Sequence, residues 1–420
     1  MDGRNSFVSI PRGLRDIMPT EAEGRRLIEN KLRKVFESWG YREIITPTFE
    51  FFDNLSSEAG RIIEEEMFKF FDRDGSLLAL RPEMTIPIAR VVSQRMQNSR
   101  FSRLYYSANV FREEPAQRGQ QREFYQVGLE FIGGKGAYAD AEVIGVLIES
   151  LQAVGLKDFQ VGIGQVDFFK GVLEGTGMSS KSIKDIQSLL VEKDMVELEQ
   201  IISQSSISSK DKSKIIEILS LCGGEDIIEK VKPYANNARS KGALENLSNL
   251  YEFLKSYSLE EFITFDFGIV RNFEYYTGVV FEVYVPNLGF PLGAGGRYDK
   301  LISEFGIDKP ACGFALGLER LHICLNEQGV LKKQEGRRVL VFSTQDLNKM
   351  FLAAKTLRDK GFQVESVLEL SSFEDCCSLA QEAVRWVINA DNAPKSVEIF
   401  DFQTNLKKVS SLSAIEGEMV

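Results

Sequence analysis

Residues Val270–Glu282 combine an arginine, two tyrosines and an apolar run in a pattern that could hold a small polar ligand. A period of two residues, typical of a β-strand, puts Tyr276, Gly278 and Glu282 on one face. The other face, which includes Tyr275, is typical of a hydrophobic core. A phenol and a carboxylate separated by a glycine leave space on the first face, so this face is a candidate binding surface.

A second segment, Arg122–Phe131, repeats the design. Alternation puts Gln126, Gly128 and Glu130 on one face and apolar residues on the other. Charged and amide groups seldom interrupt an apolar strand unless they meet water or a partner. For one strand alone, a solvated sheet face explains the pattern equally well. Two such strands, each with a glycine, favour the floor of a binding site.

Five segments of the chain resemble the signature motifs of histidyl-tRNA synthetases, which are class II aminoacyl-tRNA synthetases. They are Trp39–Pro47 (motif 1), Phe111–Glu130 (motif 2), Gly313–Arg320 (motif 3), and the two histidine-specific segments Arg271–Gly278 and Ala294–Asp299. The regulatory subunits of ATP phosphoribosyltransferase, which act in histidine biosynthesis, share these segments. The resemblance implies an α+β fold, with an antiparallel sheet of about six or seven strands flanked by helices.

Composition is that of a globular protein with more than one domain. The 420 residues are 43% hydrophobic and 27% charged, and no apolar run approaches a membrane span or a secretory signal. Five cysteines without a Cys-x-x-Cys pair predict a reducing, cytoplasmic location. A single histidine, His322, excludes a histidine-rich metal site, and no cofactor or metal is expected. The net charge of -10 argues against a general nucleic-acid surface.

The pattern of elements predicts three regions. Residues 1–328 form the synthetase-like core with a helical insertion at about 179–257, residues 329–338 a polar linker, and residues 339–420 a small α/β domain resembling a shortened anticodon-binding domain. Predicted helices cover 19–40, 138–154 and about 315–327, and predicted strands cover 68–72, 77–80, 104–112, 123–132 and parts of 263–299. Thr20 and Glu23 suggest a capping box for the first helix.

The resemblance assigns eight residues to a bound histidine. They are Glu83, Thr85, Arg112, Gln126, Glu130, Arg271, Tyr275 and Tyr276. In that assignment Glu83 receives the ammonium group and Arg271 meets the carboxylate. Glu130 and Tyr276 together recognise the imidazole ring, which carries the hydrogen-bonding groups that distinguish histidine. Taken alone, the Arg81-Pro82-Glu83 segment could be a surface turn, but the other matches favour binding.

Three positions depart from the synthetase pattern, two in the loop that would hold ATP and one beside the amino-acid ligand. Pro115 and Gln120 stand where synthetases have arginines, and Met84 replaces a glycine. Loss of cationic groups weakens stabilisation of a reacting triphosphate. Within the resemblance, these departures favour a regulatory subunit without catalytic residues. The resemblance implies that such a subunit binds histidine for feedback regulation, forms a homodimer through the core and joins a short-form catalytic subunit in a hetero-oligomer.

Two alternative functions remain open at this point. An active histidyl-tRNA synthetase would use Arg112, Arg271 and Arg320, all of which are present. A free-standing RNA-binding module is poorly supported by the acidic balance of the chain.

Overall fold

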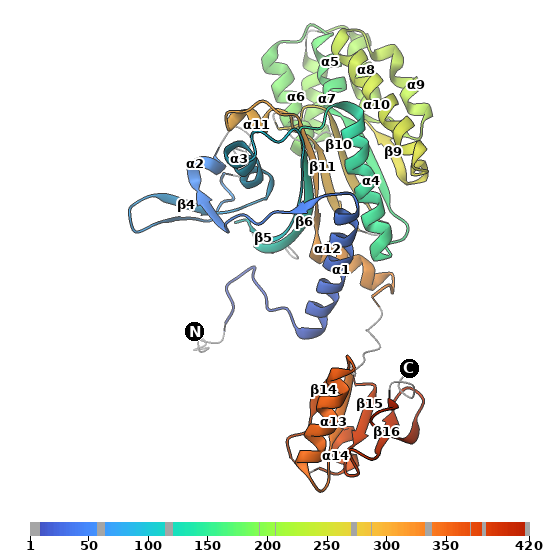
Figure 1. The fold of residues 1–420 in the computed structure, drawn as a ribbon. Helices are drawn as coiled ribbons and strands as arrows, with labels where there is room; N and C mark the ends of the chain where they lie inside the picture. The colour runs from blue at the N-terminus through green and yellow to red at the C-terminus, as the bar shows by residue number, and fades with distance from the viewer. Residues whose placement is uncertain are drawn as a thin grey trace, which may run out of the picture. The chain divides into compact units, whose positions relative to one another are not determined.

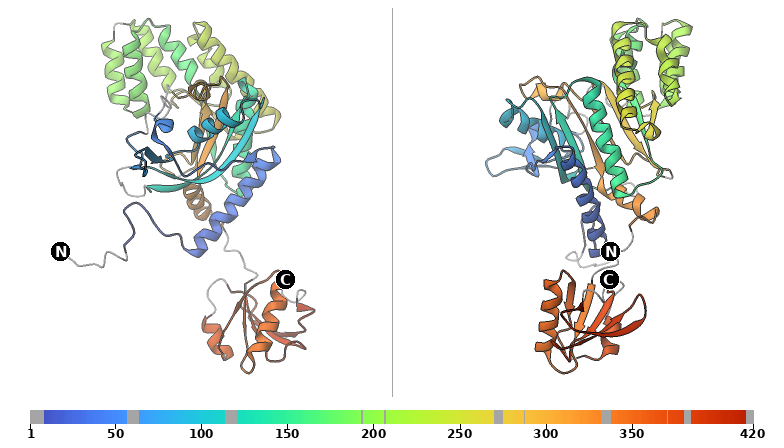
Figure 2. Two further views of the ribbon diagram at one scale, coloured as in Figure 1. Left: turned by 60° about the vertical axis from the view of Figure 1, so that its left-hand side comes forward. Right: turned by 45° about the vertical axis from the view of Figure 1, so that its right-hand side comes forward.

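The chain forms two compact units, Met1–Val330 and Leu331–Val420 (Figures 1 and 2). The computed structural model describes residues 9–56, 64–113, 121–192, 194–205, 207–269, 275–286, 288–331, 338–369, 371–379 and 384–415. Within these ranges, no helix has the length and apolar character needed to cross a bilayer. Nor do the described residues contain a cluster of three or more His, Cys, Asp or Glu side chains arranged for a metal ion.

A nine-stranded sheet organises the first unit, in the order β1-β5-β6-β12-β11-β10-β7-β9-β8. The strands are β1 (Arg42–Glu43), β5 (Ser102–Phe111), β6 (Glu123–Ile132), β7 (Gln160–Gln165), β8 (Cys222–Gly223), β9 (Ile263–Asp266), β10 (Val279–Tyr284), β11 (Gly293–Arg297) and β12 (Ala311–Gly317). The expected six or seven antiparallel strands were too few, and β1–β5 and β7–β9 are parallel pairs. The outermost strands β1 and β8 have two residues each, too short for an alternating pattern.

Helices α1 (Pro19–Ser38), α4 (Gly136–Val154) and α12 (Leu318–Glu327) cover one face of this sheet (Figure 1). Phe36 of α1 packs against the rings of Tyr105 and Phe314, with centroids 5.5 and 6.0 Å away. The predicted helix 138–154 is confirmed within two residues. Motif 3 was assigned to a helix from about residue 315, but residues 315–317 belong to β12 and the helix begins at Leu318.

The predicted capping box of the first helix is wrong. Helix α1 begins at Pro19 with Met18 as N-cap residue, and no side chain caps it. Proline suits the first helical position because its fixed φ is helical and its missing N–H would have no partner there. At the other end, Gly40 takes a φ of +80°, as expected for a glycine just past a helix.

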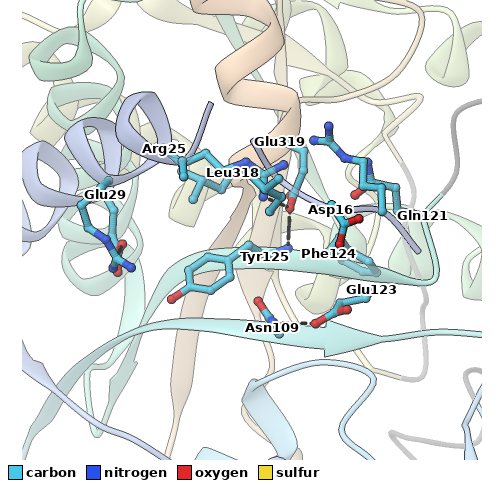
Figure 3. A pocket seen from close by; sticks show the side chains of 14 residues that line it. Asp16, Arg25, Glu29, Asn109, Gln121, Glu123, Phe124, Tyr125, Leu318 and Glu319 are labelled. Atoms are coloured by element: carbon cyan, nitrogen blue, oxygen red, sulfur yellow. Dashed lines mark hydrogen bonds and ion pairs between the residues drawn. The ribbon is translucent and has the colours of Figure 1, made fainter. Parts of the chain in front are cut away.

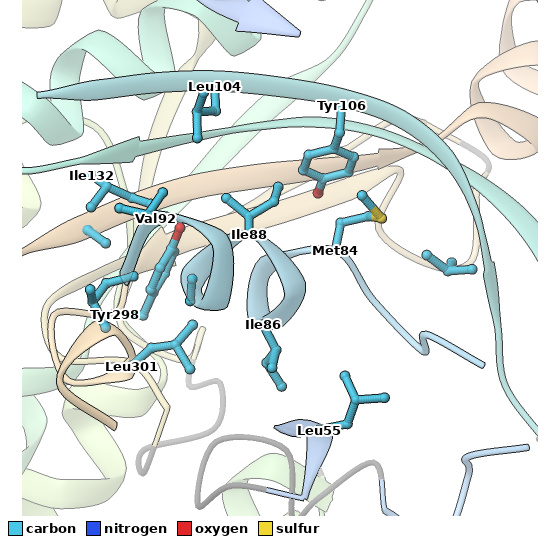
Figure 4. Packing of buried hydrophobic residues seen from close by; sticks show 14 of the residues in the cluster. Leu55, Met84, Ile86, Ile88, Val92, Leu104, Tyr106, Ile132, Tyr298 and Leu301 are labelled. Atoms are coloured by element: carbon cyan, nitrogen blue, oxygen red, sulfur yellow. The ribbon is translucent and has the colours of Figure 1, made fainter. Parts of the chain in front are cut away.

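The opposite face of the large sheet meets a smaller, three-stranded sheet and three helices. These are β2 (Phe49–Phe51), β3 (Lys69–Phe71), β4 (Leu77–Leu80), α2 (Phe52–Leu55), α3 (Thr85–Arg95) and α11 (Leu301–Glu304). Figure 4 shows how α3 places Ile88 and Val92 among buried residues of β5 and β6, such as Leu104 and Ile132. The strands expected at 68–72 and 77–80 are present as β3 and β4, but they pair with each other, and β4 also pairs with β2, so neither belongs to the main sheet.

Between β7 and β9 the chain is mostly helical. The helices are α5 (Val166–Glu174), α6 (Ser180–Glu192), α7 (Met195–Gln204), α8 (Ser209–Leu219), α9 (Asp226–Val231) and α10 (Ala238–Ser256), with the short strand β8 between α8 and α9. Asn237 and Ser240 form a capping box at the start of α10, which packs along α4 and α5. Strand β8 pairs with β9, so this region also extends the main sheet.

The second unit is a five-stranded sheet with two helices. Its elements are β13 (Arg338–Phe342), α13 (Leu347–Asp359), β14 (Gln363–Ser366), α14 (Phe373–Leu379), β15 (Trp386–Asn389), β16 (Val397–Asp401) and β17 (Leu406–Ser410). Strands β14, β13 and β15 are parallel, and β16 and β17 continue the sheet as an antiparallel hairpin. The predicted β–α alternation describes the first half, whereas the last three strands were not predicted.

Candidate functional site

The register of the large sheet gathers small residues on the face towards α3. Directly paired residues have their side chains on the same face. One row across the sheet reads Glu130, Gly313, Gly296 and Val280, and the next reads Gly128, Ala315, Ala294 and Glu282. The centre of this face is therefore almost bare backbone. Alternation predicted Gly128 on this face of β6, whereas Gly278, the glycine expected on the second strand, lies before β10.

Three side chains lie over the glycines of this floor. A Cβ atom on Gly313 would overlap the carboxylate of Glu130, and one on Gly296 would come within 2.7 Å of the Tyr276 ring. A Cβ on Gly128 would lie 2.6 Å from the Tyr106 hydroxyl oxygen. The glycines thus allow these three side chains to approach the sheet closely.

The turn before helix α3 and the first residue of this helix bring Glu83 and Thr85 over the same floor. The Glu83 carboxylate accepts hydrogen bonds from the backbone N–H groups of Thr85 and Ile86, both at 2.7 Å, and so holds the start of the helix. The Thr85 hydroxyl donates to Oε1 of Glu130 at 2.8 Å. This last bond connects Thr85 and Glu130, which are 45 positions apart and which the resemblance assigned to one ligand.

Arg81 fixes the turn that carries Glu83. Its side chain is buried and donates to the backbone oxygens of Thr46 and Asn109, both at 2.8 Å. Desolvation lowers the pKa of Arg81, but these carbonyl partners satisfy its N–H groups. The alternative of a surface turn at Arg81-Pro82-Glu83 is therefore wrong.

Glu130 lies at the bottom of the site and is 2% exposed. The Tyr298 hydroxyl donates to its Oε2 atom, while Thr85 donates to Oε1. Burial raises the pKa of Glu130 to about 8; the two hydroxyl bonds partly oppose this rise, and the nearby Glu83 adds to it. Burial likewise raises the pKa of Glu83, against the effect of its two backbone N–H partners.

The paired tyrosines both reach this cluster. Their rings are 4.8 Å apart at 81°, and the Tyr275 ring stacks on Tyr298 at 5.4 Å. Tyr275 was expected on the core face, opposite Tyr276. That expectation is wrong because β10 begins at Val279, so strand alternation does not apply to residues 275–278. Burial beside the acids Glu83 and Glu130 raises the pKa of Tyr275 well above its usual value.

The remaining assigned residues lie at the edge of this group. Arg112 donates to the backbone oxygen of Pro82 at 3.0 Å, next to Glu83. Gln126 is half-buried and lies two rows from Glu130 on the same face of β6. Arg271 falls outside the described residues.

Comparison with known proteins identifies the family. The model of the histidyl-tRNA synthetase family matches residues 13–321. An ATP phosphoribosyltransferase regulatory subunit from Caldanaerobacter subterraneus is 39% identical over 371 residues, which are 88% of this chain and 96% of that protein. One from Moorella thermoacetica is 40% identical over 361 residues, 86% of this chain and 92% of its own. The chain belongs to the family of ATP phosphoribosyltransferase regulatory subunits.

Solved structures agree with this family and its fold. A Bacillus halodurans protein described as an ATP phosphoribosyltransferase regulatory subunit/histidyl-tRNA synthetase is 32% identical, with a TM-score of 0.82 over 93% of this chain and 100% of its own. Histidyl-tRNA synthetase from Nostoc sp. PCC 7120 is 21% identical, with a TM-score of 0.85 and 98% of each chain covered. The second comparison shows that the synthetase fold is shared.

Sequence reasoning missed two members of the site in this regulatory-subunit chain. Tyr298 follows β11 and Tyr106 lies on β5, and both side chains project towards α3 (Figure 4). Tyr106 could have been found, since pairing β5 with β6 puts it opposite Gly128. Tyr298 lies beyond the end of its strand, where alternation carries no information.

A cavity of about 400 Å³ lies on the reverse face of β5 and β6 and contains none of the eight assigned residues (Figure 3). Glu319 of α12 accepts hydrogen bonds there from Arg25 of α1 at 2.9 Å and from the Tyr125 backbone at 3.0 Å. Glu123 accepts from Asn109 at 2.7 Å. The polar groups named here are hydrogen-bonded within the protein. The cavity therefore lies where α1, α12 and the sheet pack together.

Replacing Glu130 with glutamine should stabilise the first unit more strongly as pH rises. A carboxyl group with a raised pKa binds its proton more tightly in the folded state, so its contribution to stability falls from its unfolded pKa near 4.5 up to about 8. The Glu130→Gln change removes this loss, and we expect a gain of roughly 2–4 kcal/mol at pH 8 and little at pH 5.

Urea unfolding followed by Trp39 fluorescence measures the effect, in a Trp386→Phe background that leaves one tryptophan in the chain. Glu123→Gln is the matched control, because it removes a carboxylate from the reverse face of the same strand. An equal gain at pH 5 and pH 8 would contradict the prediction.

Proposed function

We propose that this chain binds free L-histidine around Glu130, and that occupancy of the site regulates a short-form ATP phosphoribosyltransferase catalytic subunit. The observation that carries the proposal is a buried carboxyl group beside a second acid, over a floor of glycines. In the proposed complex Glu83 takes the ammonium group and Glu130 with Tyr276 takes the ring. The carboxylate meets Arg271, as the sequence suggests, together with Arg112.

The regulatory effect requires that the bound ligand alter contacts that reach beyond the site. Both oxygens of Glu83 already hold the first N–H groups of α3, so an ammonium group would share them. Helix α3 packs on the main sheet and on α2 and α11, which provides a physical path from the ligand to the surface.

The proposed assembly is a homodimer through the synthetase-like core, combined with the catalytic subunit. Support comes from apolar side chains exposed near motif 1 and on the small sheet. Ile45 is 85% exposed, Phe49 52% and Phe51 56%. Neighbouring exposed apolar groups of this size are typical of protein interfaces.

Purified protein should bind L-histidine with a measurable heat of binding and discriminate strongly against leucine. An apolar side chain leaves the buried Glu130 and Tyr276 without partners, at about 1–3 kcal/mol for each group. Glu130→Ala should therefore reduce histidine affinity by more than tenfold, whereas Glu123→Ala, on the reverse face, should not. Calorimetry decides the question, and equal binding of histidine and leucine would refute the proposal.

Histidine-dependent ATP–pyrophosphate exchange should remain at background. Pro115 and Gln120 remove two cationic positions, although both lie outside the described residues. The Arg320 guanidinium donates to the Pro291 backbone oxygen at 2.8 Å and lies 4.5 Å from the Phe290 ring centre. Exchange at a synthetase-like rate would favour the alternative of an active histidyl-tRNA synthetase, with Arg112 and Arg320 as its ATP ligands.

The catalytic subunit should be nearly inactive alone, and active and histidine-sensitive together with this chain. Coupling is reciprocal, so substrates of the catalytic subunit should change histidine affinity by the same factor as histidine changes theirs, about 5- to 150-fold. The Glu130→Ala complex should be active but insensitive to histidine. If that complex were still fully inhibited, regulatory histidine would bind elsewhere.

A further inference from the structure

We propose that Glu130 enters the complex as a carboxylic acid, so that this group and the ligand ring hold a single proton between them. The inference rests on the proposed function, because it concerns the ring of the bound amino acid. The site would select histidine with a neutral imidazole ring. One nitrogen of that ring accepts a hydrogen bond or a proton from the Glu130 carboxyl group.

Among the described residues, no cation contacts Glu130 to keep it ionised; Arg271 lies outside them. The two hydrogen-bond partners of Glu130 are the neutral hydroxyl groups of Thr85 and Tyr298. Glu130 is 2% exposed and its carboxyl group lies over Gly313, so solvent contributes little to holding a charge there. Transfer of an isolated anion into such a site is strongly unfavourable, and a buried acid responds by keeping its proton.

The groups that face Glu130 come from every element packed around it. They are Glu83 and Thr85 at the start of α3, Tyr106 of β5, Tyr275 and Tyr276 before β10, Tyr298 after β11, and Cys312 of β12 from the reverse face. Among these described residues the only other acid is Glu83, which disfavours a second negative charge. The cations nearby, Arg112 and Arg297, act on Glu83 and on Asp140 instead.

The number of protons exchanged on binding follows from the protonation states of the ligand ring and of Glu130 before they meet. Below pH 6.5 the ligand ring is a cation and Glu130 is protonated, so forming a pair with one shared proton releases a proton to solvent. Between about 6.5 and 8 the neutral ring meets the protonated acid and no net exchange occurs. Above about 8 both partners have lost their protons, and binding takes one up from solvent. Affinity should be highest between these limits and fall up to tenfold per pH unit on either side.

Calorimetry of L-histidine binding to the full chain at pH 5.5, 7.3 and 8.5, each in two buffers of different ionisation enthalpy, measures the protons exchanged. We expect release approaching one proton at pH 5.5, almost none at pH 7.3, and uptake above half a proton at pH 8.5. The titration of the ligand's own amino group is measured separately and subtracted. A permanently ionised Glu130 that accepts from a neutral ring would give no uptake at pH 8.5, and one that binds a ring cation would give no release at pH 5.5. Either result overturns the inference.

Two variants test the origin of the alkaline limit without removing the carboxyl group. Tyr298→Phe deletes a donor that stabilises the ionised form, so the alkaline fall in affinity should move to higher pH. Tyr105→Phe is the control, because its hydroxyl donates to Glu37 on the reverse face of β5. An alkaline limit unmoved by Tyr298→Phe would refute the assignment to Glu130. Absence of histidine binding at every pH would instead refute the proposed function, so the two failures can be told apart.

Discussion

Burial of the Glu130 carboxyl group is the constraint on which the rest of the site depends. A group that is 2% exposed has to find every hydrogen-bond partner within the protein. Gly313 provides the space beneath it, Thr85 meets it from α3, and Tyr298 meets it from the end of β11. Each partner comes from a different part of the chain, so the site exists only when the large sheet and α3 are both in place.

A similar dependence explains why an arginine is buried under the turn at Glu83. The Arg81 side-chain bonds to the backbone oxygens of Thr46 and Asn109 add to the backbone bonds that hold this turn over β5. Glu83 then holds the N-terminus of α3, and α3 holds Thr85 over Glu130. Because these contacts form one series, a ligand that shared Glu83, as we propose, would act on the same bonds that position the helix.

The parts of the site that lie on long strands could be predicted from sequence, and the others could not. Alternation along β6 correctly put Gln126, Gly128 and Glu130 on one face, because ten paired residues hold the strand in register. Tyr275 was misplaced and Tyr298 was missed because both lie just beyond a strand end, where turns set side-chain direction. The edge strands β1 and β8 were not predicted because a strand of two residues is too short to show an alternating pattern.

The residues around Glu130 and those around Arg320 are held by different parts of the synthetase-like fold. The groups suited to an amino acid belong to the most constrained part of the molecule, where the glycine floor and the buried acid leave little freedom. The guanidinium of Arg320, by contrast, rests on a backbone oxygen and an aromatic ring at the edge of β12. The proposed recognition of the amino acid at Glu130 therefore does not depend on the contacts that hold Arg320.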